Sequence, residues 1–241
     1  MISKNEIKYI QTLYHKKTRD EENVFVAEGP KLAEELLHSN FTVRKIYALS
    51  KWIEKHPQIA ATEITPEELE KISRLDTPNQ TLAIIEKKKQ DSNNVSFTKQ
   101  ITLALDGIQD PGNFGTIIRI ADWFGIRQVI ASEDCVDCYN PKTVQSTMGS
   151  IFRVNVFYTN LEKCLSESNA PVFGALLNGE NVQHATPAEE GILVIGNESK
   201  GIRENILPYI TQSLTIPAFG QAESLNAAVA TGIILSHLVQ R

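Results

Sequence analysis

The sequence has few cysteines, no long hydrophobic run and no excess of positive charge. Three cysteines in 241 residues cannot build the disulfide framework typical of small secreted proteins, and this low number fits a reducing compartment. No apolar run approaches the roughly 20 residues that a transmembrane helix requires, and the polar start of the chain lacks the apolar core of a signal peptide. We therefore expect a cytoplasmic protein with no membrane contact.

Two nucleotide-binding fingerprints are also missing. No Gly-x-Gly-x-x-Gly follows the first apolar strand of the second half, and no Gly-Lys-Ser or Gly-Lys-Thr occurs anywhere. These absences weaken the case for the common dinucleotide-binding and P-loop enzymes.

The composition is otherwise that of a folded soluble protein. Hydrophobic residues make up 41% and charged residues 22% of the chain, close to the average of globular domains and far from disordered chains. The length suits one large or two modest domains. A net charge of −5 is unfavourable for a nucleic-acid partner, because phosphate binding is driven by Lys and Arg side chains.

The charge is unevenly distributed along the chain. The first nineteen residues contain a single carboxylate, Glu6, and five cations: Lys4, Lys8, Lys16, Lys17 and Arg19. Ile7, Ile10 and Tyr14 recur there at helical spacing, which predicts an amphipathic helix with a basic face. Such a face is either solvated surface or a binding surface for a polyanion.

Short strands and helices alternate through the first half of the chain. Strands are expected over residues 24–27, 43–49 and 81–86, with helices over 30–38 and 51–55 and a further helix that starts at Pro66. This pattern predicts a small α/β domain over residues 1–90. The tract that follows is polar and loses its periodicity, so residues 91–100 are expected to be a linker.

The second half, residues 101–241, shows a stronger alternation. Apolar, β-branched runs occupy residues 101–105, 128–131, 155–158, 172–175, 192–195 and 214–216, with helices expected over 113–124, 142–148, 161–166 and 203–210. This order predicts a parallel sheet covered on both faces. The final helix, over 224–239, is apolar almost all round and must be buried in the core or against another subunit.

Three loops follow buried strands and carry polar side chains. They comprise residues 106–119, 196–201 and 217–226. Ligands of doubly wound α/β proteins bind beyond the carboxyl ends of the strands, where these loops are expected. A purely structural role would explain any one of these loops, because its glycines can close turns and Asn113 and Ser224 can cap helices. Three such loops together favour a ligand site.

These loops resemble the motifs of the SpoU, or TrmH, family of SPOUT RNA methyltransferases. The three matching motifs, in the family's order, are Asn113-x-Gly115-x-x-x-Arg119, Gly196-Asn-Glu198-x-x-Gly201 and Ile216-Pro…Ser224-Leu-Asn226. The stretch from Ser3 to Gly29 is similar to the small substrate-binding domain that many members carry. The resemblance thus spans essentially the whole chain.

The resemblance implies methyl transfer from S-adenosylmethionine to a ribose 2′-hydroxyl of RNA. It implies an α/β fold in which a SPOUT catalytic domain, with a parallel sheet and a deep trefoil knot, follows a small α/β substrate-binding domain; a knot would be an exception to the rule that chains do not thread loops. Family members are typically homodimers whose active site uses both subunits. Ribosomal RNA is the preferred substrate, with transfer RNA, or a catalytically silent RNA-binding or ribosome-assembly protein, as alternatives.

The resemblance also assigns site residues. The catalytic set is Arg119, Asn113, Glu198, Ser224 and Asn226, and the cofactor-binding set is Leu176, Gly196, Ile216, Leu225 and Asn226. Arg119 is the residue that would activate the 2′-hydroxyl, but a guanidinium is a poor base, so positioning of an RNA phosphate is an equally good role.

The remaining cations and cysteines complete the sequence predictions. The basic face of Lys4, Lys8, Lys16, Lys17 and Arg19 would bind RNA phosphates, and Arg153 and Arg203 are weaker candidates for the catalytic groove. Cys135 and Cys138 have metal-ligand spacing, but no second pair completes a tetrahedral site, so no metal is expected.

Overall fold

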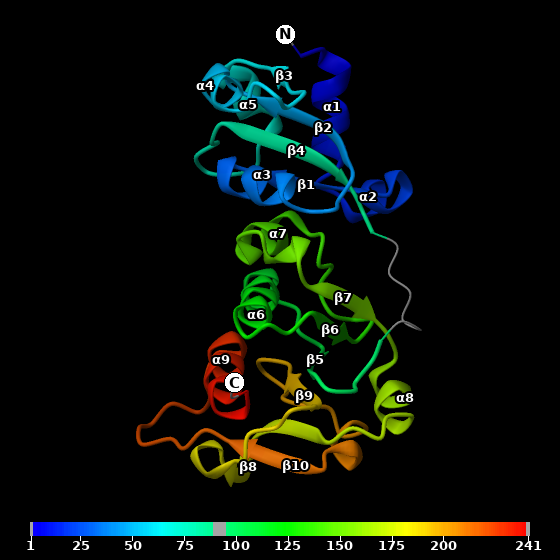
Figure 1. Ribbon diagram of the computed structural model, residues 1–241, viewed down its shortest axis with the longest axis vertical. Helices are drawn as coiled ribbons and strands as arrows, with labels where there is room; N and C mark the ends of the chain where they lie inside the picture. The colour runs from blue at the N-terminus through cyan, green and yellow to red at the C-terminus, as the bar shows by residue number, and fades with distance from the viewer. Residues whose placement is uncertain (1, 89–94, 240–241) are drawn as a thin grey trace.

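The computed structural model describes residues 2–88 and 95–239, which form two sheets stacked along the long axis of the molecule (Figure 1). The sheet nearer the N-terminus has the strand order β1-β4-β2-β3, and the second has the order β10-β8-β9-β5-β6-β7. All pairings in the second sheet are parallel. The predicted α/β class with a parallel sheet is therefore confirmed.

The amino-terminal part, residues 2–88, builds the smaller sheet. Its elements are α1 (Lys4–Thr12), α2 (Lys16–Glu22), β1 (Val24–Glu28), α3 (Pro30–Leu37), β2 (Val43–Ala48), α4 (Ser50–Lys55), β3 (Thr62–Glu63), α5 (Pro66–Ile72) and β4 (Thr81–Glu86). Alternate residues of β4 face opposite sides, as a pleated strand requires. Leu82 and Ile84 pack against α1 and α5, whereas Ala83 and Ile85 join the core that continues into the second sheet.

The single helix expected over the first nineteen residues is two helices. Ser3 starts α1 with a capping box that it shares with Glu6, and His15 is extended (φ −91°, ψ 132°) before α2 begins. The turn between the helices buries Leu13 and lets the Tyr14 hydroxyl donate to Glu28 at 2.7 Å. Because these contacts interrupt the helix, the five cations do not share one helical face.

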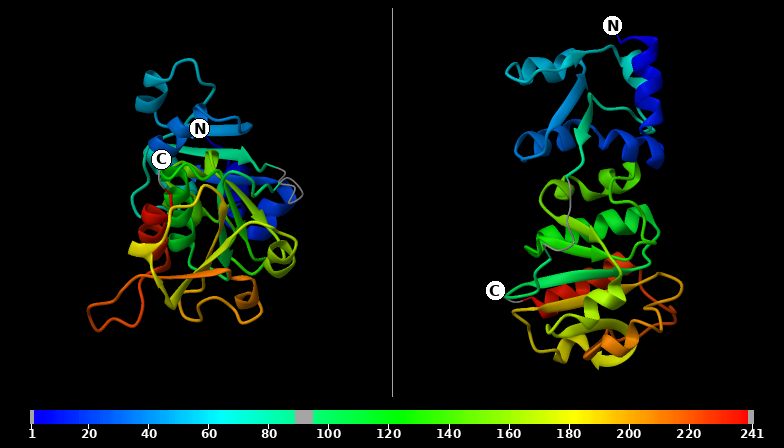
Figure 2. Two further views of the ribbon diagram at one scale, coloured as in Figure 1. Left: turned by 60° about the horizontal axis from the view of Figure 1, so that its bottom comes forward. Right: turned by 90° about the vertical axis from the view of Figure 1, so that its right-hand side faces the viewer.

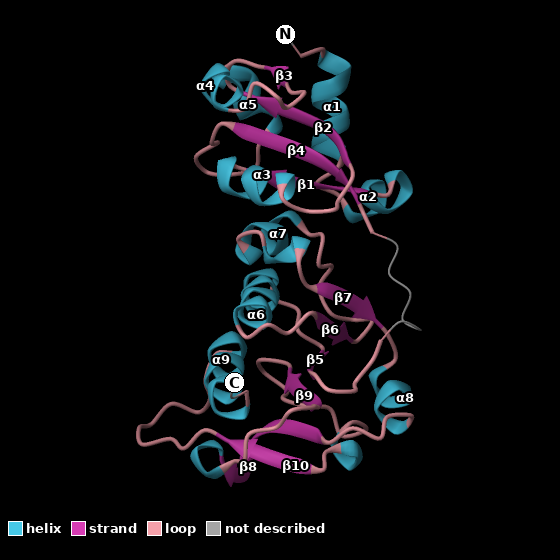
Figure 3. Cartoon of the chain, in the orientation of Figure 1, coloured by secondary structure: helices cyan, strands magenta, loops and turns pink. Residues whose placement is uncertain are grey.

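The carboxy-terminal part, residues 95–239, builds the larger sheet. Its elements are β5 (Ile101–Asp106), α6 (Pro111–Trp123), β6 (Gln128–Ala131), α7 (Pro141–Thr147), η2 (Ser150–Phe152), β7 (Asn155–Tyr158), α8 (Leu161–Ser166), β8 (Val172–Asn181), η3 (Val182–His184), β9 (Gly191–Gly196), η4 (Leu207–Tyr209), β10 (Gln212–Thr215) and α9 (Ala227–Leu238). Helices α6, α7 and α9 pack on one face of the sheet and α8 packs on the other (Figures 1 and 3). The predicted two-sided cover is present.

Three elements of this part differ from the sequence prediction. The helix expected over 203–210 is only the short 3₁₀ turn η4, which contains Pro208. Helix α9 starts at Ala227, because the side chain of Asn226 caps it by accepting from the backbone N–H groups of Ala228 and Val229. Strand β8 is longer than expected, and its register against β10 jumps from Gly174 to Glu180. Leu176 was expected to follow this strand but lies within the jump.

The two parts share one hydrophobic core. Helix α3 and strand β1 face α7 and η2 across the junction (Figure 2). Phe25 of β1 lies 4.5 Å from Tyr139, and Phe41 lies 5.4 Å from Phe152, measured between ring centroids. The division into domains at residues 91–100 remains a prediction, and residues 91–94 of that linker lie outside the described residues. Among the described helices, none is long and apolar enough to cross a membrane.

Candidate active site

The three motif loops meet at one edge of the larger sheet. They follow β5, β9 and β10, and the carboxyl ends of parallel strands lie at the same edge. Two hydrogen bonds join them. The Asn113 side chain donates from Nδ2 to Glu198 Oε1 at 2.8 Å, and Asn226 Nδ2 donates to Asn113 Oδ1 at 2.7 Å. One residue of each motif thus belongs to a single hydrogen-bonded network, with Asn113 at its centre.

Local sequence places Asn113 in the first turn of α6. The side chain of Asp110 caps this helix and accepts from the Asn113 backbone N–H at 2.7 Å. Two residues later, Gly115 lets α6 approach α7 closely. A Cβ atom there would lie 2.5 Å from the carbonyl oxygen of Thr143 and 2.6 Å from Ser146 Cβ. This motif glycine is therefore required by helix packing.

The second loop is a tight turn that presents Glu198. Asn197 Nδ2 donates to the carbonyl oxygen of Gly107 at 2.7 Å, and Asn197 Oδ1 accepts from the backbone of Ser199 and Lys200. Gly201 closes the turn at φ +69°, a region that favours glycine. These contacts bind the second loop to the first and direct Glu198 towards Asn113.

An ion pair between a buried carboxylate and a partly exposed guanidinium, behind the loops, was not foreseen from the sequence. Asp106, at the end of β5, is fully buried and accepts from Arg203 Nε at 2.6 Å and from the Arg203 backbone N–H at 2.8 Å. The carboxylate raises the pKa of the Arg203 guanidinium further above its ordinary value. Arg203 is thus an anchor for the second loop. Arg153, the other groove candidate, is paired with Asp122 and Glu35.

The third loop is the most exposed of the three. It extends away from the body of the molecule between β10 and α9 (Figures 1 and 3). Ser224 and Leu225 are exposed on it, and only its last residue, Asn226, is tied into the network. The structure therefore brings Asn113, Glu198 and Asn226 together and leaves Ser224 outside these hydrogen bonds.

Arg119 is exposed on α6 and is separated from the network. It lies six residues after Asn113, and six steps of about 100° place the two side chains about 120° apart around the helix axis. Within one chain, Arg119 therefore leaves α6 on a different face from Asn113.

The residues expected to hold the cofactor lie along the same edge of the sheet. Gly196 ends β9, and Ile216, directly after β10, is half-buried. The Thr215 hydroxyl donates to the carbonyl oxygen of Leu176, so the irregular part of β8 lies beside the end of β10. In this part of β8 the residues between Gly174 and Glu180 are not paired with β10.

The basic residues near the N-terminus are only partly available. Lys4 and Lys8 are exposed on α1. The side chains of Lys16 and Lys17 on α2 are 69% and 86% exposed, with Asp20 and Glu21 one turn away at 3.7 and 3.9 Å. Arg19 is 1% exposed and pairs with Asp137. The expectation that Arg19 contributes to an RNA-binding face is therefore wrong, since its guanidinium is buried between the two parts.

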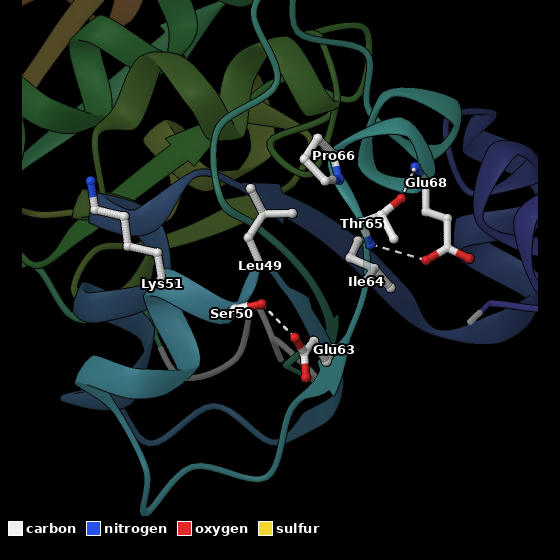
Figure 4. Close-up of a pocket in the computed structure, with 8 residues that line it drawn as sticks. All are labelled: Leu49, Ser50, Lys51, Glu63, Ile64, Thr65, Pro66 and Glu68. Carbon is white, nitrogen blue, oxygen red and sulfur yellow. Dashed lines mark hydrogen bonds between the residues drawn. The ribbon is translucent and has the colours of Figure 1, made fainter.

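Two pockets lie outside the motif loops. One, of about 510 Å³, is in the amino-terminal part between the end of β2 and the start of α5 (Figure 4). Its polar groups are largely engaged with one another: Ser50 bonds Glu63, and Thr65 and Glu68 form the capping box of α5. A second cavity of about 320 Å³ adjoins Ser132, Glu162 and Arg203.

The cysteine pair is part of the core. Cys135 and Cys138 are buried, and burial raises the pKa of the Cys138 thiol to about 12. Within residues 2–88 and 95–239, no group of three or more His, Cys, Asp or Glu side chains is arranged to hold a metal ion.

Comparison with known proteins identifies the family. The model of the SpoU rRNA methylase family matches residues 100–236, and the model of the MRM3-like substrate binding domain matches residues 4–83. The chain belongs to the SpoU rRNA methylase family. Among SpoU relatives, it is 35% identical to the Bacillus subtilis 23S rRNA (guanosine(2553)-2′-O)-methyltransferase RlmP, over 98% of this chain and 97% of the relative. The resemblance seen in the three motifs is confirmed.

Solved structures of SpoU-like proteins have the same fold. A TrmH-family protein from Porphyromonas gingivalis is 36% identical, with a TM-score of 0.85 and coverage of 99% of this chain and 98% of that one. An rRNA methyltransferase from Sinorhizobium meliloti with bound AdoMet is 28% identical, with a TM-score of 0.88 and coverage of 99% and 95%. The match extends over both sheets of the structure.

Proposed function

We propose that this SpoU-family chain is an S-adenosylmethionine-dependent methyltransferase that acts on a ribose 2′-hydroxyl of structured RNA, and that the RNA is ribosomal. The observation that carries this proposal is the network from Glu198 through Asn113 to Asn226, which joins all three family motifs. The named relatives support the substrate class, since RlmP and RlmB are 23S rRNA 2′-O-methyltransferases.

The residues at the edge of the sheet fit the cofactor. We assign its binding to Leu176, Gly196, Ile216, Leu225 and Asn226. The exposed Leu225 and half-buried Ile216 offer apolar contacts, and the part of β8 that is unpaired with β10 offers backbone donors and acceptors suited to an adenine ring. S-adenosylmethionine, when bound, supplies an electrophilic methyl group. We also propose that the segment that carries these residues forms the trefoil knot implied by the resemblance to the SpoU family.

The side chains of the network would position the attacking ribose. Transfer of a methyl group requires an oxygen aligned with it and a route for the oxygen's proton. Asn113 is fixed by Glu198 on one side and by Asn226 on the other, so its amide is held in one orientation. Ser224 is exposed beside this network on the third loop, where it can reach the substrate. Arg119 would hold an RNA phosphate or activate the 2′-hydroxyl.

We further propose that the enzyme is a homodimer that pairs through α6 and α9. These helices pack side by side (Figure 1) and carry exposed apolar side chains: Trp123 is 85% exposed and Val229 is 50% exposed. The apolar helix α9 is thus only partly covered within its own chain. A second copy of the chain would cover the exposed side of α9. Arg119 lies on a different face of α6 from Asn113, as expected for a residue that acts in the active site of the partner subunit.

Subunit mixing tests this arrangement. Arg119→Ala and Asn113→Ala chains, each strongly impaired alone, would be unfolded together, refolded and assayed. If Arg119 acts across the dimer, half of the dimers are mixed and each mixed dimer has one complete site, so about a quarter of wild-type activity returns. No recovery in dimers shown to be mixed would place Arg119 and Asn113 in the same chain's site.

We propose that residues 1–90 form the RNA substrate-binding domain and residues 101–241 the catalytic domain. The exposed Lys4, Lys8, Lys16 and Lys17 would bind RNA phosphates, and RNA affinity should fall as salt is raised. We further propose that the enzyme acts in the cytoplasm.

The function is tested by two measurements. Calorimetry with S-adenosylmethionine should show binding to the wild-type protein and to Arg119→Ala. Ribose methylation should then be mapped in total RNA from cells with and without the gene, and one 2′-O-methyl position in ribosomal RNA should disappear. If the missing 2′-O-methyl position lies in transfer RNA instead, the enzyme is a transfer RNA methyltransferase. Cofactor binding with no methylation lost from any RNA would contradict the enzymatic proposal.

A further inference from the structure

Arg19 connects the amino-terminal part to the carboxy-terminal part of the molecule. Its Nη2 donates to Asp137 Oδ2 at 2.7 Å, and its Nη1 donates to the backbone carbonyl oxygens of Leu13 and Tyr14 at 3.1 and 2.9 Å. The guanidinium is thus held by the turn between α1 and α2 on one side and by a carboxylate of the second part on the other.

Asp137 belongs to a segment that packs directly beneath the first motif loop. This segment, residues 132–140, connects β6 to α7. The backbone N–H of Val136 donates to the carbonyl oxygen of Ile108 at 2.9 Å, and the Gly107 N–H donates to Ser132 Oγ at 2.9 Å. Ile108 belongs to the first motif loop and lies five residues before Asn113, so the segment that carries Asp137 is hydrogen-bonded directly to the loop that leads to the network.

The Arg19–Asp137 pair is better suited to orientation than to stability. The Arg19 side chain is 1% exposed and that of Asp137 11% exposed, so both charges are largely removed from water, which is costly. Arg19 Nε also has no hydrogen-bond partner among the described residues. A well-packed apolar pair in its place would often be as stable or more so. What the ion pair adds is direction, because Arg19 must meet one carboxylate oxygen and two carbonyl oxygens at once.

We propose that Arg19 and Asp137 are positioning residues for methylation, which fix the RNA-binding part relative to the loop that carries Asn113. The inference rests on the proposed function. RNA held by the exposed lysines of α1 and α2 reaches the active site at a place set by this contact. Arg153 bonds both Glu35 of α3 and Asp122 of α6. It therefore connects the two parts at a second place and limits their rotation about the Arg19 contact.

Paired substitutions distinguish this role from direct RNA contact. Arg19→Met removes the positive charge. Asp137→Asn removes the negative charge but keeps a side-chain oxygen, which can still accept a hydrogen bond from the Tyr139 N–H, as Asp137 Oδ1 does in the wild type at 2.9 Å. The variant with both substitutions completes a double-mutant cycle. Arg44→Met is a matched control, because Arg44 pairs only with Glu22 and Glu86 of its own part among the described residues. The substrate is ribosomal RNA from cells that lack the gene.

If the two residues position the RNA, each single variant should lower kcat by about 10- to 100-fold, the cost of a small misplacement of reacting groups. S-adenosylmethionine affinity and the KM for RNA should stay unchanged. The double variant should be no slower than the slower single variant, because both changes remove one interaction. Arg19→Lys, which keeps the charge, should recover part of the rate lost in Arg19→Met, and Arg44→Met should match the wild type.

Three results would overturn the inference. In the first, Arg19→Met raises the KM for RNA while Asp137→Asn has no effect, which would make Arg19 an RNA contact. In the second, all variants methylate at the wild-type rate. In the third, the losses in kcat are additive in the double variant. A wild-type protein that methylates no RNA would instead contradict the proposed function itself.

Discussion

Replacing Asn113 with Asp would test the centre of the motif network. The Asn113 side chain donates to Glu198 Oε1 at 2.8 Å, and Asp presents a carboxylate oxygen at the same place. The Asn113 amide donor that faces the Glu198 carboxylate is thus replaced by a second carboxylate. The perturbation changes neither the size of the side chain nor the cap that Asp110 provides to the Asn113 backbone.

The magnitude follows from the lost hydrogen bond. A hydrogen bond to a charged group contributes about 1.5–3 kcal/mol, and the Asn113–Glu198 bond is only half-buried, so solvent screening moderates the added repulsion. If this energy is lost from the transition state, methylation slows by about 10- to 100-fold at pH 8, since each 1.36 kcal/mol is a tenfold change in rate.

The effect should depend on pH in one direction. Two neighbouring carboxylates raise the pKa of the pair above the ordinary carboxyl value. The repulsion is therefore present above that raised pKa and disappears as the pH falls through it, when one carboxyl binds a proton and donates it to the other. The rate of Asn113→Asp, divided by the wild-type rate, should rise as the pH is lowered from 8 to 5.

Single-turnover methylation across this pH range is the assay. Asn113→Ala is the matched control, because it loses the donor without adding a carboxylate and should show a deficit that does not vary with pH. An Asn113→Asp variant that equals the wild type at pH 8, or whose deficit grows as the pH falls, would refute the reasoning.

Two further predictions concern stability. Gly115→Ala should lower the free energy of unfolding by about 1–3 kcal/mol, seen as a lower Tm, because its Cβ would meet the Thr143 carbonyl oxygen at 2.5 Å; Gly220→Ala, with nothing within 4 Å, should leave the Tm nearly unchanged, and equal effects would contradict this account. A hydrogen bond from Lys45 lowers the pKa of Glu6 from 4.5 to about 2, so this contact stabilises the fold above pH 4.5 and is lost as the pH falls towards 2. Glu6→Gln should therefore lose less stability than the wild type over that window, measured by urea unfolding, and an unchanged pH dependence would show that the contact contributes nothing.

The sequence was informative wherever a residue's role is local. Strand boundaries such as those of β4, β6 and β7 follow from short apolar runs with β-branched residues, and they agree with the structure. The class of the larger sheet follows from strands without polar alternation, because only a sheet covered on both faces buries such strands. The family follows from three motifs whose residue types and order are visible in the chain.

Prediction failed where a residue's partner lies far away in sequence. Arg19 looked like a surface cation until folding brought it to Asp137, 118 residues later. Nothing in the sequence indicated that the Arg203 guanidinium bonds Asp106, 97 residues earlier, although its side chain stays 42% exposed. The helix expected across Leu13 broke because burial of that side chain, and the contact of Tyr14 with Glu28, outweigh local helical spacing.

By itself, the sequence determined the fold class, the family and the residue types that gather at the candidate site, because hydrophobic periodicity and motif spacing are local properties of a chain. Only the tertiary structure decided which of those residues meet. It joined Asn113 to Glu198 and Asn226, and turned Arg19 from a surface charge into a contact between the two parts. The physical reason is that a charge's role depends on its burial and its partner, and folding sets both.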